Sequence, residues 1–157
     1  MAVKYYNQED LDKLKAELHD LKKRGRREMA REIADARDKG DLSENAEYDA
    51  AKEKQGHLEA RIAFLEGEIG DARILDESKI ADTTKVMILS KVKVRNLKFN
   101  KVMNYILVSP SAADLKKGKL SINTPIAKGL MGHKAGDMVA IKVPRGVMKF
   151  EILEVGR

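Results

Sequence analysis

Residues 40–49 read GDLSENAEYD and separate two long segments whose apolar residues recur at helical spacing. The first segment carries its apolar stripe at Leu11, Leu14, Leu18, Leu21, Gly25, Met29, Ile33 and Ala36. The second carries its stripe at Ala51, Leu58, Ile62, Leu65, Ile69 and Ala72. Such spacing places each stripe on one face of a helix. Two stripes joined by a short connection predict an antiparallel helical hairpin, with residues 40–49, here called the acidic tip, at its turn.

The first helix is expected to begin near Asn7, a favourable N-cap residue that is followed three positions later by Asp10. From Leu21 the stripe continues in steps of four, which is a local slip in the heptad pattern. Gly25 costs about 1 kcal/mol of helix stability relative to alanine. Each arm has about 30 residues, so at ~1.5 Å per residue the hairpin is ~45 Å long. Because the stripes are narrow, most of each arm is expected to face water.

After about residue 83 the apolar period changes to two, which indicates β-strands. Strands are predicted within residues 85–94, 100–110, 119–123, 136–144 and 147–155. Between the third and fourth of these, Thr124 and Pro125 are typical of a helix start, and Gly132 of its end.

The predicted fold class is therefore α+β. An antiparallel α-helical coiled-coil hairpin is expected over residues 1–76, a linker over 77–82, and a small antiparallel sheet domain with one short helix over 83–157.

Composition excludes several classes of function. Aromatic residues make up 4% of the chain and Trp is absent, which disfavours stacking on unpaired bases as the main activity. The absence of Cys excludes disulfides, thiolate nucleophiles and zinc ribbons. No signal-peptide-like or membrane-spanning apolar run is present, so a cytoplasmic protein without membrane attachment is expected. A sequence pI near 9.4 favours an acidic partner, either nucleic acid or an acidic protein surface.

The region of the acidic tip has a net charge opposite in sign to that of the whole chain. Between residues 35 and 49 six acids face two bases, a net charge of −4, which leaves +10 for the rest of a chain whose formal net charge is +6. The acids are Asp35, Asp38, Asp41, Glu44, Glu47 and Asp49.

Helix capping accounts for part of this acidic charge. Asp41 and Glu44 have the spacing of a capping box, and Ser43 is another good cap. Crowded carboxylates nevertheless cost free energy unless a cation compensates them. Mg²⁺ is commonly held by one or two carboxylates together with waters and substrate phosphates. Two exposed acids would therefore bind it weakly alone, and better where another protein supplies a first metal ion and a phosphodiester, as two-metal hydrolysis requires.

Residues 36–69, ARDKGDLSENAEYDAAKEKQGHLEARIAFLEGEI, closely resemble the hairpin of the bacterial Gre transcript-cleavage factors, a family of transcription elongation factors, and the GreA type in particular. Residues 122–137, INTPIAKGLMGHKAGD, resemble a second landmark of that family. The resemblance extends over essentially the whole chain.

The resemblance implies an N-terminal coiled coil and a C-terminal FKBP-like domain that docks on the polymerase. Family members insert the coiled coil into the secondary channel of bacterial RNA polymerase. When the nascent RNA 3′ end has backtracked, the tip acids help to hold the second Mg²⁺ and to orient the attacking water, and the polymerase's own active site cuts the RNA. Such a factor is not itself an enzyme, has no tightly bound cofactor beyond Mg²⁺ shared with the polymerase, and is expected to be a monomer.

Carried onto this chain, the resemblance gives Asp41 and Glu44 the metal-binding and catalytic role inside the polymerase complex. Ser43, Asn45 and Tyr48 match the surrounding motif and are expected to support it.

A basic run in the first arm admits two interpretations. It consists of Lys22, Lys23, Arg24, Arg26, Arg27 and Arg31. It is either a solvated face balanced by acids of the partner helix, or a surface for RNA phosphates and polymerase. A second row, at Lys91, Lys93, Arg95, Lys98 and Lys101, is typical of the solvated face of a sheet, with docking to polymerase as the alternative. The FKBP-like resemblance does not extend to prolyl isomerase activity, because the second half offers only Phe99, Tyr105 and Phe150 for an aromatic pocket.

Two other functions stay open from sequence. A channel-binding inhibitor that does not promote cleavage has the same architecture, although retention of Asp41 and Glu44 argues against it. A basic nucleic-acid-binding coiled coil would bind free RNA or DNA in a salt-sensitive manner without polymerase.

Overall fold

The computed structural model describes residues 3–40, 45–76, 80 and 82–157. The chain divides into two compact units. Gln8–Ala72 forms the hairpin unit, and Arg73–Arg157 forms the sheet unit together with the first strand of the chain.

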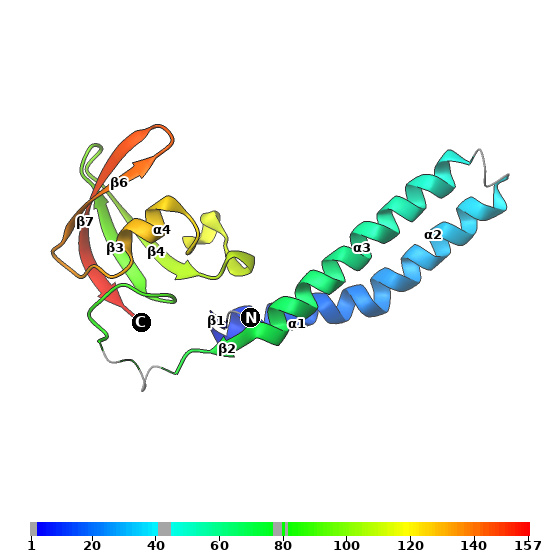
Figure 1. Cartoon of the computed structure of the whole chain (residues 1–157), viewed down its shortest axis with the longest axis horizontal. Helices are drawn as coiled ribbons and strands as arrows, with labels where there is room; N and C mark the ends of the chain where they lie inside the picture. Colours follow the sequence, from blue (N-terminus) through cyan, green and yellow to red (C-terminus); the bar gives the residue numbers. More distant parts are fainter. Residues whose placement is uncertain (1–2, 41–44, 77–79, 81) are drawn as a thin grey trace. The chain divides into compact units, whose positions relative to one another are not determined.

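The hairpin unit is built from helices. Its first arm consists of α1 (Gln8–Asp20), a π-helical turn (Leu21–Gly25) and α2 (Arg26–Asp38). Its second arm is the single helix α3 (Ala46–Asp71), which packs antiparallel along the first arm (Figure 1). The predicted stripes are confirmed, because Leu11, Leu14, Met29, Ile33 and Ala36 of the first arm and Ala51, Ile62 and Leu65 of the second are buried.

The π-helical turn explains the slip in the heptad pattern. The backbone N–H of Arg26 donates to the carbonyl of Leu21, five residues earlier, so one extra residue is accommodated in this turn. The stripe can therefore advance in steps of four and still face α3. At Gly25 a Cβ atom would lie 3.3 Å from Cδ1 of Leu58, so the missing side chain lets the two arms approach closely.

The sheet unit contains a five-stranded sheet in the order β5-β4-β3-β7-β6 (Figure 1). Its elements are β3 (Lys91–Asn96), β4 (Lys101–Val108), β5 (Lys119–Ser121), α4 (Pro125–Leu130), β6 (Met138–Val143) and β7 (Gly146–Gly156), with short 3₁₀ turns at Pro110–Ala112 and Leu115–Lys117. Three of the pairings are antiparallel and β4 pairs with β5 in parallel, so the sheet is mostly antiparallel. The α+β class is confirmed.

The core of the sheet unit lies between one face of the sheet and α4. Val94, Leu107, Phe150 and Ile152 are fully buried there. Thr124 caps α4, as predicted, since its side chain accepts a hydrogen bond from the backbone N–H of Ala127. The predicted Pro125 at the first helical position is also confirmed.

Two further details differ from expectation. The strand predicted from residue 85 begins only at Lys91, because a turn precedes it. In this turn Leu89 has a positive φ of 68°, and the Ser90 hydroxyl accepts a hydrogen bond of 2.9 Å from the Met87 N–H. A two-stranded sheet of β1 (Lys4–Tyr6) and β2 (Ala72–Ile74) was not predicted.

The first strand belongs to the sheet unit, although residues 1–76 were all expected in the hairpin. The Ser109 hydroxyl donates to the carbonyl of Tyr5 at 3.0 Å, and the Tyr6 hydroxyl is hydrogen-bonded to Ser111. These partners lie about a hundred residues further along the chain, so local sequence could not indicate them. None of the helices in the described ranges has the length and apolar character needed to cross a membrane.

Candidate functional site at the acidic tip

The acidic tip joins α2 to α3 at one end of the hairpin unit. Three of its predicted functional residues, Asp41, Ser43 and Glu44, lie outside the described residues. Asn45 and Tyr48 are described, together with the ends of the two helices that lead into and out of the tip.

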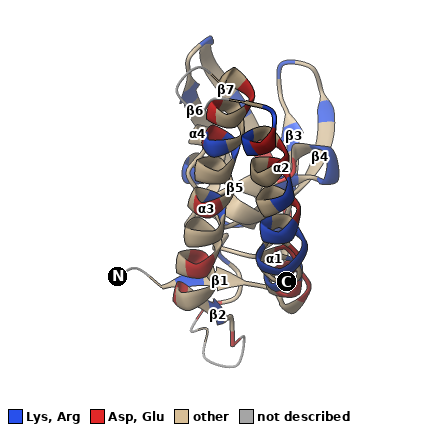
Figure 2. Ribbon diagram, turned by 90° about the vertical axis from the view of Figure 1, so that its right-hand side faces the viewer, with Lys and Arg blue, Asp and Glu red and all other residues tan. Residues whose placement is uncertain are grey.

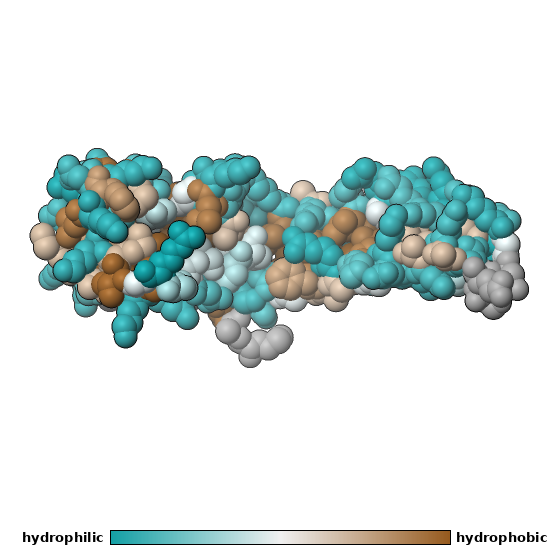
Figure 3. All heavy atoms as spheres, turned by 90° about the horizontal axis from the view of Figure 1, so that it is seen from above, coloured by the Kyte–Doolittle hydropathy of each residue, from teal (hydrophilic) through white to brown (hydrophobic). Residues whose placement is uncertain are grey.

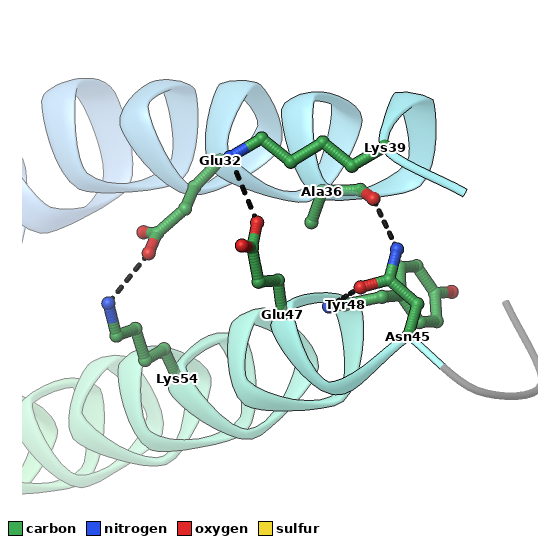
Figure 4. A network of polar contacts seen from close by, with 7 residues as sticks. All are labelled: Glu32, Ala36, Lys39, Asn45, Glu47, Tyr48 and Lys54. Atoms are coloured by element: carbon green, nitrogen blue, oxygen red, sulfur yellow. Dashed lines mark hydrogen bonds and ion pairs between the residues drawn. The ribbon is translucent and has the colours of Figure 1, made fainter. Parts of the chain in front are cut away.

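Asn45 connects the two helices with a single side chain (Figure 4). Its Oδ1 atom accepts a hydrogen bond of 3.0 Å from the backbone N–H of Tyr48, which makes Asn45 the N-cap of α3. Its Nδ2 group donates to the carbonyl of Ala36 near the end of α2. The helix α3 begins at Ala46, directly after Asn45, while the capping box considered for Asp41 and Glu44 lies outside the described residues. An amide side chain can both accept and donate, so it serves both helix ends at once.

Tyr48 anchors the start of α3 to the first arm. Its half-buried ring packs against the cluster formed by Met29, Ile33, Ala36 and Ala51, and the guanidinium carbon of Arg37 lies 6.0 Å from the ring centroid. The motif residues Asn45 and Tyr48 thus hold the framework of the acidic tip together.

The acids around this framework are not explained by capping. Asp35 and Asp38 are exposed in the last turn of α2, where the helix dipole disfavours negative charge. Glu47 forms an ion pair of 2.9 Å with Lys39, and this hydrogen bond raises the pKa of Lys39. Among the described residues the side chains of Asp38 and Asp49 have no hydrogen-bond or ion-pair partner. This end of the hairpin unit consequently keeps an excess of negative charge.

Ion pairs between described residues connect the two arms, and they set the register of the helices more than they stabilise the fold. They join Glu17 to Arg61, Lys22 to Glu66, Arg26 to Glu59, Glu32 to Lys54, and Lys39 to Glu47, at 2.6–3.4 Å. All are at least 40% exposed, so solvent screens each pair and its contribution to stability is small. The hydrogen bond from Arg26 lowers the pKa of Glu59.

Figure 2 shows blue basic and red acidic residues along the ribbons of α1 and α2. The basic run of the first arm divides into two groups by its ion pairs. Lys22 and Arg26 pair with acids of α3, which fits the interpretation of a face balanced by the partner helix, whereas Arg24 pairs with Asp20 of its own arm at 2.8 Å. Lys23, Arg27 and Arg31 recur every four residues and are exposed. Within the described part of the chain none of these three has an ion pair or a side-chain hydrogen bond. We call them the free basic face.

The described residues contain no group of three His, Cys, Asp or Glu side chains that could hold a metal ion.

Replacing Asn45 by Ala is expected to lower the free energy of unfolding of the hairpin unit by about 1–2 kcal/mol, because a cap and a second hydrogen bond are lost together. Hydrogen exchange at the first backbone amides of α3 should accelerate in the same variant. Asn45→Asp is the matched control, since its carboxylate still accepts from the Tyr48 N–H but cannot donate to the Ala36 carbonyl. Its free energy of unfolding should lie between those of the wild-type protein and the Asn45→Ala variant. An Ala variant with unchanged exchange would contradict the bridging role.

The architecture is that of a two-part α+β protein, in which a helical hairpin with an acidic turn is followed by a small α+β unit. Residues 4–74 match the family model described as "Transcription elongation factor, N-terminal", and residues 81–157 match "Transcription elongation factor, GreA/GreB, C-term". The chain belongs to the GreA/GreB family of transcription elongation factors, as the resemblance in the sequence indicated.

Individual relatives align along nearly their full length. The transcription elongation factor GreA of Flavobacterium johnsoniae is 55% identical over 99% of this chain and 98% of its own. That of Amoebophilus asiaticus is 53% identical over 98% and 97%. Among solved structures, GreA factor homolog 1 of Thermus thermophilus is 23% identical with a TM-score of 0.44, and the GreA/GreB factor of Nitrosomonas europaea is 22% identical with a TM-score of 0.43. Both alignments cover all of each chain.

Proposed function

We propose that this elongation factor binds the secondary channel of bacterial RNA polymerase and stimulates the polymerase's own cleavage of backtracked RNA, with Asp41 and Glu44 as the assisting acids. In this proposal the chain has no independent nuclease activity. Its partners are the polymerase and the nascent RNA 3′ end.

The observation that carries the proposal is the acidic tip framed by Asn45 in a member of the GreA/GreB family. The N-cap of α3 is Asn45, so a good start of that helix does not require the carboxylates of Asp41 and Glu44. Asp35 and Asp38 add negative charge where the dipole of α2 disfavours it. Glu47 and Asp49 suit the first turn of α3, and Glu47 also pairs with Lys39, but the carboxylates beyond these support a role toward a cation.

The donor chemistry fits Mg²⁺. Asp41 and Glu44 offer two carboxylates, and Mg²⁺ sites that act on phosphates are commonly made of one or two carboxylates, waters and the phosphate itself. These two residues would share the ion with the polymerase. The chemistry such an ion supplies is activation of a water molecule and stabilisation of charge on the phosphodiester. The contribution of this chain is to bring and orient the two carboxylates.

A stalled, backtracked polymerase complex with end-labelled RNA tests the proposal directly. Addition of the protein should shorten the RNA and allow elongation to resume. Blocked elongation without shortened RNA would instead identify a channel-binding inhibitor. Tight, salt-sensitive binding to free RNA together with a negative polymerase pull-down would identify a nucleic-acid-binding coiled coil.

The free basic face is proposed to contact phosphates of the extruded RNA. Changing Lys23, Arg27 and Arg31 to Gln should weaken crosslinking to the RNA 3′ segment. It should also make stimulated cleavage less sensitive to salt: the slope of the logarithm of binding against the logarithm of salt concentration should fall by about 0.7 for each phosphate that is no longer neutralised. The matched control changes Lys116, Lys128 and Lys142 to Gln. These three lysines are exposed in the sheet unit, and the control removes the same net charge. Equal effects of the two triple variants would contradict a local contact and indicate a net-charge effect.

A further inference from the structure

A cleft of about 880 Å³ lies between two turns of the sheet unit. One wall is the turn that joins β3 to β4, and the other is the turn that joins β6 to β7. The cleft is far in sequence from the acidic tip, and nothing in the proposed function requires it.

The backbone holds both walls in place. Beyond the pair of Asn96 with Phe150, β7 continues to Gly146 in register with β6 only, so this hairpin extends past the end of β3. The Leu97 N–H donates to the carbonyl of Lys149 at 3.0 Å and fastens the β3–β4 turn against that hairpin. The buried Asn96 side chain accepts from the backbone N–H groups of Lys98 and Phe99 at 3.0 and 3.3 Å, which stabilises the turn.

The cleft is lined by apolar side chains that water reaches. They are Leu97, Phe99, Val143, Pro144, Val147 and Met148. Phe99 is 70% exposed and Val147 58%, although such side chains are normally buried. On the face of the sheet unit seen in Figure 3, brown apolar atoms lie at the surface among teal polar ones. An exposed apolar patch with a polar rim is typical of an interaction site.

The rim of the cleft carries charge of one sign. Lys98, Arg145 and Lys149 line it, and no acidic residue is among the lining residues of the described chain. The Lys98 ammonium lies 5.4 Å from the centroid of the Phe99 ring, so cation and aromatic face the same space. The complementary ligand has an apolar anchor surrounded by negative charge.

We propose that this cleft binds an acidic peptide segment of a partner protein, with a large aliphatic or aromatic side chain inserted between Phe99, Val147 and Met148. A peptide fits better than RNA, because five of the six apolar residues that line the cleft are non-aromatic, whereas unpaired bases are bound by stacking on several aromatic rings. The β6–β7 hairpin extends past the end of β3, so an extended peptide chain could lie beside it.

Fluorescence anisotropy with the full-length protein tests this binding. The probe is a short fluorescein-labelled peptide in which Asp and Glu residues flank one Leu-Phe pair. Binding with a Kd of about 10–100 μM is expected, as for a small solvent-open site. Chemical shift changes in ¹⁵N-labelled protein should concentrate at residues 96–99 and 143–149. A peptide with Ser-Ser in place of Leu-Phe should bind at least about tenfold more weakly.

Two variants assign the binding to the cleft. Phe99→Ser should weaken it about tenfold, and Lys98→Glu combined with Lys149→Glu about 10–100-fold. The matched controls are Leu115→Ser, and Lys116→Glu combined with Lys128→Glu, since Leu115 is 74% exposed and none of these residues lines the cleft. All of these side chains are exposed, and unchanged thermal unfolding verifies that the variants are folded. Equal binding of the Ser-Ser peptide, no effect of Phe99→Ser, or tighter binding of a labelled oligouridylate at the same residues would each overturn the proposal.

Discussion

The double variant Asp41→Asn with Glu44→Gln is expected to lose stimulated RNA cleavage by about 100-fold or more, with polymerase binding retained within about twofold. The amides keep the size and much of the hydrogen bonding of the carboxylates, but they remove the negative charge that a shared Mg²⁺ requires. A time course of cleavage of end-labelled RNA in a backtracked complex gives the first quantity, and a polymerase pull-down gives the second.

The control for this variant removes the same charge from neighbouring helix ends. Asp38→Asn with Asp49→Asn changes two exposed acids that have no side-chain partner among the described residues. If that control loses as much cleavage as the tip variant, the effect belongs to the general field of the hairpin end. Wild-type cleavage by the Asp41/Glu44 variant would show that the proposed mechanism is wrong.

The second large effect is expected in the core of the sheet unit. Phe150→Ala should lower the free energy of unfolding of this unit by about 3–5 kcal/mol, because a fully buried ring is removed and a cavity remains. Phe150 lies on β7 between Asn96 of β3 and Val139 of β6, so its loss affects both pairings. Because the chain has two units, unfolding in urea should be followed at amides of β3 and β7, not by a global signal.

Phe99→Ala is the matched control for the core variant. It removes the same ring from the same unit, but from a position that is 70% exposed. Its effect should be no more than about 0.5 kcal/mol. A large destabilisation by Phe99→Ala, or a small one by Phe150→Ala, would contradict the assignment of the core.

The framework of the hairpin was accessible from sequence because its signal is local. Positions such as Leu14, Ile33 and Leu65 recur at helical spacing, and burial of one stripe against another follows from that spacing alone. The same holds for Thr124 and Pro125 at the start of α4, where cap and helix lie within four residues of each other.

The N-cap of α3 was not identified from sequence, for the opposite reason. Asp41, Ser43 and Asn45 are all good N-cap residues, and local sequence offers no criterion to choose among them. The decisive partner of Asn45 is the carbonyl of Ala36 on the other helix.

The two-part α+β organisation, the family and the acidic tip between two helices could all be read from the amino-acid order, since each depends on periodicity or on a continuous motif. The folded chain was needed to show that Asn45 joins the helix ends, that β1 belongs to the sheet unit, that half of the basic run is free, and that two distant turns enclose a cationic apolar cleft. These features depend on contacts between residues far apart in the chain. A linear pattern carries no information about which of many compatible partners such residues meet in space.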